Sequence, residues 1–232
     1  MDKDYQELKK WLDETKDEPL ETMAGFFEAR IHFYEEHMSK WKSYYQWMAD
    51  LLPVSTETLL DIGCGTGLEL DYIFIRFPNL QTVGVDLSNK MLQKLYSKHH
   101  DKNLTLVCED YFTYDMGMER FDAVVSFQTL HHYTFEKKKM LFKKIFDCLK
   151  PGGVYIECDY IATSQAIEDL AFSEYNRRRL RDGIKDDVFV HFDTPLTLEH
   201  ELNVIKSAGF NTVELVGFLP NDNHTAMIRA IK

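Results

Sequence analysis

Apolar residues recur every three or four positions in three stretches of the first 52 residues. The last of these stretches runs from Met38 to Leu52 and stops at Pro53, and its spacing predicts a helix with one buried face. Beyond Pro53 the pattern changes, because short apolar runs alternate with segments of helical spacing. This alternation predicts an α/β domain with a doubly wound, mostly parallel sheet.

Seven short apolar runs are predicted to be the strands of this sheet. The parallel ones are Leu59–Ile62, Thr82–Asp86, Leu104–Val107, Phe121–Val125 and Val154–Cys158. The last two, Thr212–Phe218 and Thr225–Ile231, are separated by a connection too short for a crossover, so we expect an antiparallel hairpin.

The same pattern predicts the organisation of the chain. Residues 1–52 are expected to form a helical cap, and residues 53–232 a single domain. The connection at about 160–197 is much longer than the two to six residues that usually join such elements. We therefore expect it to be an insertion that covers one side of the domain.

Composition and charge narrow the functional classes. The chain has 232 residues, 44% of them apolar, and a net charge of −11, which indicates a folded protein and disfavours binding to nucleic acid. The first residues are charged, which argues against a signal peptide, and no apolar stretch is long enough to predict a membrane span. The four cysteines form no Cys-x-x-Cys pair, so we expect reduced thiols, no metal site and a cytoplasmic location.

A glycine-rich turn, Asp61-Ile62-Gly63-Cys64-Gly65-Thr66-Gly67, follows the first predicted strand. Its glycines let the backbone turn sharply and approach a ligand closely. The third glycine comes one residue earlier than in dinucleotide-binding turns, which favours a ligand without a pyrophosphate. Asp86 ends the second strand, where its carboxylate can accept both hydroxyls of a ribose. The pattern therefore indicates an adenosine ligand.

With these motifs the chain resembles the class I S-adenosylmethionine (SAM)-dependent methyltransferases, in particular those that act on small molecules. The matching segments are Leu59–Gly67, Val83–Leu87, Glu109–Tyr111, Phe121–Tyr133 and Leu149–Gly153, followed by the C-terminal hairpin. The resemblance covers about residues 56–232. It implies a Rossmann-like fold, SAM as the cofactor, and an N-terminal lid on which Arg30 and Tyr34 are placed to reach the cofactor's carboxylate.

The resemblance also implies which residues hold the cofactor. Asp61 would orient the methionine amino group, Asp86 the ribose and Asp110 the adenine amino group, while Leu87 would pack on the adenine and Phe127 would border the sulfonium. The full predicted set is Asp61, Gly63, Cys64, Gly65, Asp86, Leu87, Asp110, Tyr111 and Phe127.

The segment after the fourth strand points to the acceptor. It contains the Leu-His-His sequence typical of small-molecule enzymes and lacks the Asn/Asp-Pro-Pro-Tyr of those that methylate adenine or glutamine. His131 is expected to be a general base, since imidazole titrates near neutral pH, and Glu157 is a second catalytic candidate. The predicted acceptor-binding residues are His132, Tyr160, Arg178 and His191. A packing role for the histidines and a solvated helix face for the arginines are the structural alternatives.

These features predict transfer of a methyl group from SAM to an oxygen, nitrogen or sulfur atom of a small molecule held beneath a helical lid. Two alternatives stay open. One is an RNA-modifying enzyme acting on tRNA, which the negative charge disfavours. The other is a SAM-binding partner subunit without chemistry of its own. The identity of the acceptor and the oligomeric state cannot be read from the sequence.

Overall fold

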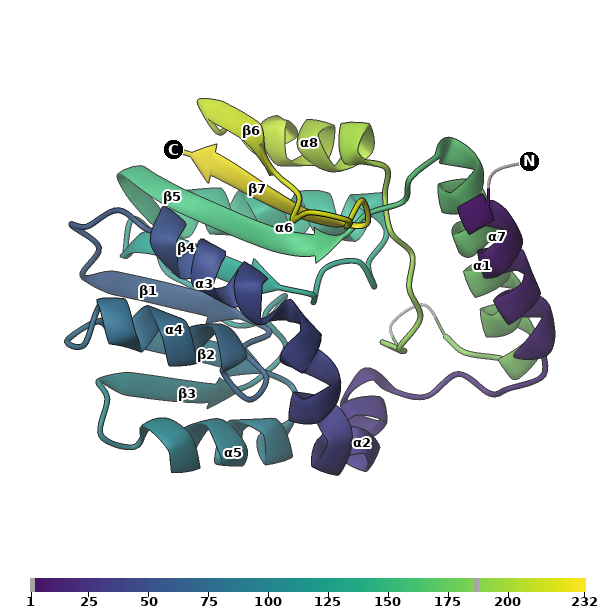
Figure 1. The fold of residues 1–232 in the computed structure, drawn as a ribbon, viewed down its shortest axis with the longest axis horizontal. Helices are drawn as coiled ribbons and strands as arrows, with labels where there is room; N and C mark the ends of the chain where they lie inside the picture. The colour runs from purple at the N-terminus through teal and green to yellow at the C-terminus, as the bar shows by residue number, and fades with distance from the viewer. Residues whose placement is uncertain (1–2, 186–187) are drawn as a thin grey trace.

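The computed structural model describes residues 3–185 and 188–232, and its seven strands form a single sheet (Figure 1). The strands are β1 (Thr58–Ile62), β2 (Gln81–Asp86), β3 (Leu104–Cys108), β4 (Phe121–Phe127), β5 (Leu149–Tyr160), β6 (Thr212–Gly217) and β7 (Thr225–Ile231). Their order is β3-β2-β1-β4-β5-β7-β6, and β7 runs in the opposite direction to the other six. The predicted fold class and the C-terminal hairpin are confirmed.

Helices cover both faces of the sheet. They are α1 (Lys3–Glu14), α2 (Met23–Met38), α3 (Lys42–Leu51), α4 (Leu68–Arg76), α5 (Asn89–His99), α6 (Phe135–Cys148), α7 (Gln165–Asp182) and α8 (Leu198–Ser207). Apolar side chains of α3, α4 and α5 pack on one face, and those of α6 and α8 pack on the other. The strand order reverses beside β1, and in such sheets the crevice at this reversal is where ligands bind.

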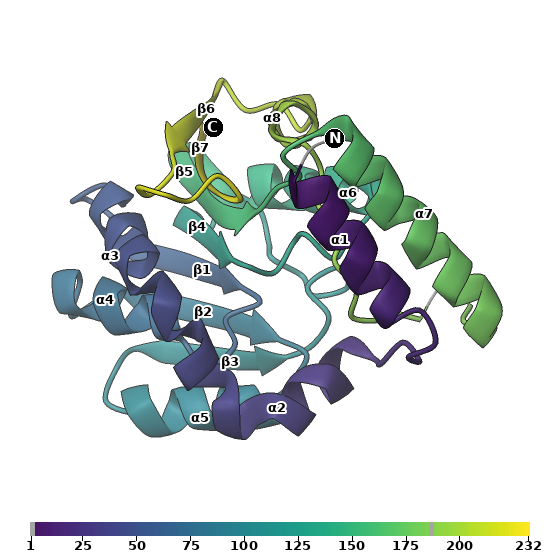
Figure 2. The same ribbon diagram turned by 45° about the vertical axis from the view of Figure 1, so that its right-hand side comes forward.

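The helical region before β1 differs from the prediction in one respect. The apolar periodicity from Met38 to Leu52 predicted one helix, but α2 ends at Met38 and a 3₁₀ turn, Ser39–Trp41, separates it from α3. The single-helix prediction is therefore wrong at this point. The turn redirects the chain, so that α3 packs on the sheet while α2 extends past its edge (Figure 2).

The N-terminal helices and the segment after β5 lie together beyond the carboxyl ends of the parallel strands. Helix α1 runs alongside α7 (Figures 1 and 2), and Thr22, just before α2, forms a β-bridge with Val190. Tyr44 on α3 ties this region to the sheet, because its hydroxyl donates to the Thr225 carbonyl at 2.7 Å and accepts from the Leu219 amide at 2.9 Å. In the described part of the chain, no helix is long and apolar enough to cross a membrane.

Candidate functional site

The glycine-rich turn joins β1 to α4 and is held against the end of β2. Gly63, Gly65 and Gly67 have φ values of +68°, +49° and +71°, which glycine adopts without the cost that a Cβ adds. Asp86 fixes the turn from β2: one oxygen accepts from the Gly65 amide at 2.9 Å and the other from the Ser88 amide at 2.7 Å. Ser88 also caps α5 by accepting from the Met91 amide.

Asp61, the residue predicted to orient the methionine amino group, is fully buried at the carboxyl end of β1. Neither of its carboxylate oxygens has a hydrogen-bond partner among the described residues. Burial, and then the nearby carboxylate of Glu69, raise its pKa well above the usual range for aspartate. A buried acceptor without a donor is costly, and a cationic amino group would relieve that cost. Asp61 therefore fits the ammonium group of SAM.

A narrow cavity of about 40 Å³ lies where the adenosine is expected. Gly63, Asp86, Leu87 and Tyr111 line it, together with Met23, Ala24, Phe27, Ser88, Thr129 and Phe189. This volume accommodates a few water molecules and no purine. An adenosine held at Asp86 and Leu87 would lie against the start of α2 and against Phe189.

Gly63 tolerates no larger residue, because an ideal Cβ there would lie 2.3 Å from Oγ1 of Thr129. We expect Gly63→Ala to lower the free energy of unfolding more than Gly152→Ala does, by about 1–3 kcal/mol. Gly152 is the matched control, since its φ is +77° and no described atom lies within 4 Å of its Cβ position. Urea unfolding of both variants measures the difference, and equal losses would contradict it.

Three other residues of the predicted cofactor set make contacts within the protein. The Cys64 sulfur packs into the space above Gly84 on β2, and Phe127 packs on Tyr45 of α3 with ring centroids 4.4 Å apart. Asp110 follows β3, where its Oδ1 accepts from the Phe112 amide at 2.8 Å. Direct contact of these three with a cofactor stays a prediction.

A larger cavity of about 640 Å³ lies beside the glycine turn, between α2 and the ends of β4 and β5. Its outer wall is aromatic and comes mainly from α2, with Phe26, Phe27, Phe33, Tyr34, His37 and Trp41. Its inner wall is polar and includes Gln128, His131, His132, Tyr160, His191 and Asp193. The structure thus brings together His131, His132, Tyr160 and His191, all of them predicted from the sequence.

His131 is held by a carboxylate that the sequence analysis did not single out. Its Nδ1 lies 2.5 Å from Oδ1 of Asp159 at the end of β5, and Oδ2 of Asp159 accepts from the Leu130 amide. Burial alone would lower the pKa of His131, but Asp159 and then Asp193 outweigh it and raise the pKa to about 10. With that pKa the ring carries a proton at neutral pH, so the general-base role stays a prediction that requires the proton to be displaced first.

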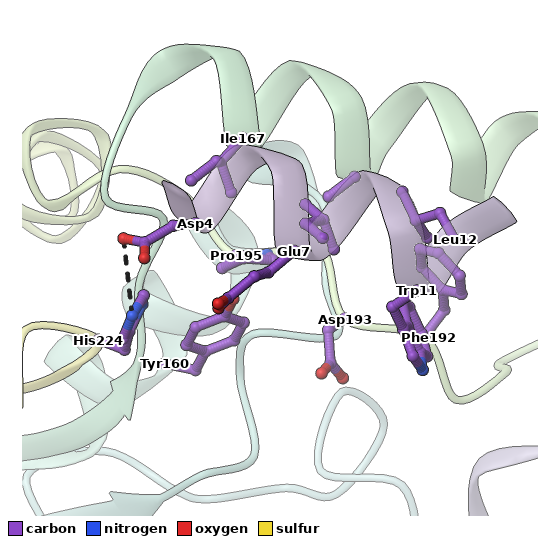
Figure 3. A pocket seen from close by; sticks show the side chains of 12 residues that line it. Asp4, Glu7, Trp11, Leu12, Tyr160, Ile167, Phe192, Asp193, Pro195 and His224 are labelled. Atoms are coloured by element: carbon purple, nitrogen blue, oxygen red, sulfur yellow. Dashed lines mark ion pairs between the residues drawn. The ribbon is translucent and has the colours of Figure 1, made fainter. Parts of the chain in front are cut away.

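Asp193 is the second carboxylate that sequence reasoning missed. Its Oδ1 lies 3.2 Å from Nδ1 of His132 and 3.6 Å from Nε2 of His131. Asp193 and Tyr160 also line an adjoining cavity of about 410 Å³ beneath α1, where Figure 3 shows the Asp193 carboxylate directed away from that helix. In the sequence, Asp193 stands out only by its place two residues after His191. Its partners, His131 and His132, are about 60 residues away, so the sequence does not show that the three side chains meet.

Glu157, the second catalytic candidate, lies in the core rather than in the cavity. Side chains alternate along a strand, so Glu157 shares the sheet face of Tyr155, whose ring packs 5.8 Å from that of Phe142 on α6. Among the described residues, neither Glu157 oxygen has a hydrogen-bond partner. Burial, and then Glu201, raise its pKa well above the ordinary value of 4.5, which keeps the group neutral.

The raised pKa makes Glu157 a source of pH-dependent stability. The folded protein keeps a proton that the unfolded chain releases above its lower pKa, so this group favours folding less and less as pH rises. Glutamine cannot ionise, so we expect Glu157→Gln to melt at a higher temperature than the wild type at about pH 8, with a gap that narrows toward about pH 5. Thermal unfolding at both pH values measures this gap. A gap that does not change with pH would refute the assignment.

Arg178, predicted to bind the acceptor, is buried away from the 640 Å³ cavity. Its guanidinium donates to Glu174 on its own helix and to Leu12 and Thr15 at the end of α1. Its neighbour Arg181 donates to the Lys16 and Glu18 carbonyls. The arginine cluster therefore fastens α1 to α7, and a contact of Arg178 with an anionic acceptor is not supported by this arrangement.

Comparison with known proteins places this geometry in context. Residues 59–153 match a protein family described as a methyltransferase domain. A carboxy-S-adenosyl-L-methionine synthase from Nautilia profundicola is 22% identical over 175 residues, which cover 69% of this chain and 72% of that protein. A phosphoethanolamine N-methyltransferase from Plasmodium falciparum is 25% identical over 167 residues, covering 72% of this chain and 58% of that enzyme.

Solved structures share the fold. Human N-acetylserotonin methyltransferase in complex with SAM superposes with a TM-score of 0.64 at 17% identity, covering 91% of this chain and 59% of that one. A SAM-dependent methyltransferase from Mesorhizobium loti gives 0.59 at 20% identity, covering 81% and 98%. The chain thus spans under two thirds of the Plasmodium and human enzymes.

Proposed function

Because the chain carries a class I SAM-dependent methyltransferase domain, we propose that it transfers a methyl group from SAM to an oxygen, nitrogen or sulfur atom of a small molecule held in the 640 Å³ cavity. One observation carries the proposal. Tyr34 lines this cavity, and its hydroxyl also lies 3.4 Å from the Cβ position of Gly65 in the glycine turn. The cavity therefore adjoins the place where the cofactor is expected.

Asp61 and Asp86 would hold the cofactor, through its ammonium group and its ribose. Bound there, SAM would supply a methyl group on a sulfonium, which an acceptor's lone pair could take as the carbon–sulfur bond breaks and its electron pair stays on sulfur. A methyl group activated in this way needs alignment more than further activation. The aromatic wall from α2 and the polar wall of His131 and Tyr160 would align the acceptor and keep water out.

The acceptor class is proposed from the size and the walls of the cavity. Its outer wall, α2, is joined to the inner segment by the Thr22–Val190 bridge and by the stacking of Phe26 on His191, with ring centroids 3.4 Å apart. An aromatic-lined cavity of about 640 Å³ suits a small organic molecule. A polynucleotide would instead need an open surface with many cations, and this chain carries a net charge of −11.

Incubation with methyl-labelled SAM and cell extract, split into small-molecule and RNA fractions, tests this proposal. We expect label in the small-molecule fraction for the wild type and for Asp122→Ala, whose carboxylate lies far from the cavity at the amino ends of the strands. We expect no label for Asp86→Ala. Label in the RNA fraction alone, or no transfer at all, would contradict the proposal.

A further inference from the structure

The two histidines and the carboxylate on the inner wall of the cavity form a compact cluster. One nitrogen each from His131 and His132 and one oxygen from Asp193 lie within 4.8 Å of one another. Both rings are buried, and Asp193 is part-exposed toward the cavity. Side chains that lie close together do not always bind a common ligand. The distances between their donor atoms show whether these three could bind one metal ion.

The separations from Asp193 match those between ligands of one metal ion, and Nδ1 of His132, which also lies 3.3 Å from the Phe192 carbonyl oxygen, would have to give up that hydrogen bond to bind it. Nε2 of His131 lies 3.6 Å from Oδ1 of Asp193, which is too long for a hydrogen bond. Nδ1 of His132 lies 3.2 Å from the same oxygen, at the long end of the hydrogen-bond range. Ligands at about 2.0–2.2 Å from a metal ion stand about 3.0–3.5 Å from each other. Both separations fall in or next to that range.

The surroundings of His131 match those of a metal-binding histidine. Its Nδ1 is held by Asp159, so the other ring nitrogen, Nε2, is the one that would release its proton and bind a metal ion. Histidines that bind metals usually have their second nitrogen held by a carboxylate in this way, which fixes the ring and makes the free nitrogen a better ligand. Asp159 is itself fixed by the Leu130 and Tyr160 amides.

We propose that His131, His132 and Asp193 bind a divalent first-row transition ion at the inner wall of the cavity. Two imidazoles and one carboxylate form a ligand set used for ions such as Fe²⁺ and Zn²⁺, and they occupy three coordination positions. Because all three side chains line the cavity, the remaining positions would open into it. If the proposed function is right, they would hold an oxygen atom of the acceptor, which makes an oxygen-bearing acceptor the expected class. This departs from the expectation, based on the cysteines, that the chain has no metal site.

Binding of Co²⁺ and Zn²⁺ to untagged, chelator-treated protein tests the proposal without cofactor or acceptor. We expect one equivalent to bind, and the visible spectrum of Co²⁺ to show nitrogen and oxygen ligation. Asp193→Ala and His132→Ala should weaken binding at least about 10-fold, and Asp159→Asn by about 10- to 100-fold. His200→Ala is the control, since His200 pairs with Glu168 outside the cavity, and it should bind like the wild type.

Two results would overturn the metal site: no uptake by the wild type, or equal uptake by wild type, Asp193→Ala and His132→Ala, which would mean adventitious binding. Circular dichroism confirms folding, and Asp193→Asn, a conservative change at a part-exposed position, provides a second variant if His132→Ala does not fold. SAM binding is measured separately on the same samples. Its presence without metal binding refutes only the metal site, and metal binding without SAM binding refutes only the proposed function.

Discussion

Replacing Asp86 with alanine should weaken the binding of S-adenosylhomocysteine about 100-fold. Hydrogen bonds to a charged group contribute about 1.5–3 kcal/mol each, and about 2.7 kcal/mol corresponds to a factor of 100. Asp86 is expected to accept the ribose hydroxyls, and it also holds the Gly65 amide that shapes the glycine turn. Equilibrium dialysis with labelled S-adenosylhomocysteine measures the change.

Asp122→Ala is the matched control for this effect. Asp122 also uses its carboxylate to accept two backbone amides, those of Glu57 and Thr58 at 3.1 and 2.9 Å, but it does so at the opposite end of the sheet. It should lose stability without losing affinity. An Asp86→Ala variant that binds as tightly as Asp122→Ala would remove Asp86 from the cofactor site.

Replacing Lys138 with methionine should lower the free energy of unfolding by about 3–5 kcal/mol, because it leaves a buried charge without its partner. Lys138 on α6 and Glu201 on α8 are fully buried and form an ion pair between the two helices. The Glu201 carboxylate would then face the core beside Glu157 with no cation to balance it. A loss of this size is a large part of the stability of an ordinary domain.

The double variant Lys138→Met/Glu201→Leu separates the lost charge balance from lost packing. With both partners apolar, most of the stability should return, because replacing a whole buried pair is often neutral or stabilising. Urea unfolding of the wild type and both variants provides the comparison. A single variant within about 1 kcal/mol of the wild type, or a double variant less stable than the single one, would contradict this role.

The strands of the sheet could be predicted because each of them is a short, contiguous apolar run in the sequence. The sequence predicted a strand starting at Val154, yet β5 starts at Leu149 and includes Pro151, Gly152 and Gly153. Pairing with the C-terminal end accounts for this difference, since the Gly152 amide donates to the Lys232 carbonyl at 3.0 Å. That partner is distant in sequence, so local patterns carry no sign of it.

In the candidate site, too, residues of contiguous motifs could be predicted, and residues whose partners are distant in sequence could not. Asp61, Gly63 and Asp86 follow directly from a contiguous turn and a strand end, and the structure brings them together at the ends of β1 and β2, while their contact with a cofactor stays a prediction. Asp159 and Asp193 could not be found, because their roles depend on which histidine the fold brings beside them. Arg178 was predicted to bind the acceptor, whereas in the fold its guanidinium donates to Leu12 at the end of α1, and Arg181 donates to the Lys16 and Glu18 carbonyls just beyond that helix.

SAM is expected to bind at the carboxyl ends of β1 and β2. Calorimetric titration of the wild-type protein with SAM tests this most directly. We expect a single site with a dissociation constant in the range of about 1 μM to 1 mM, as for the substrates of most enzymes. Absence of any binding heat at several temperatures, with the protein shown to be folded, would contradict the claim.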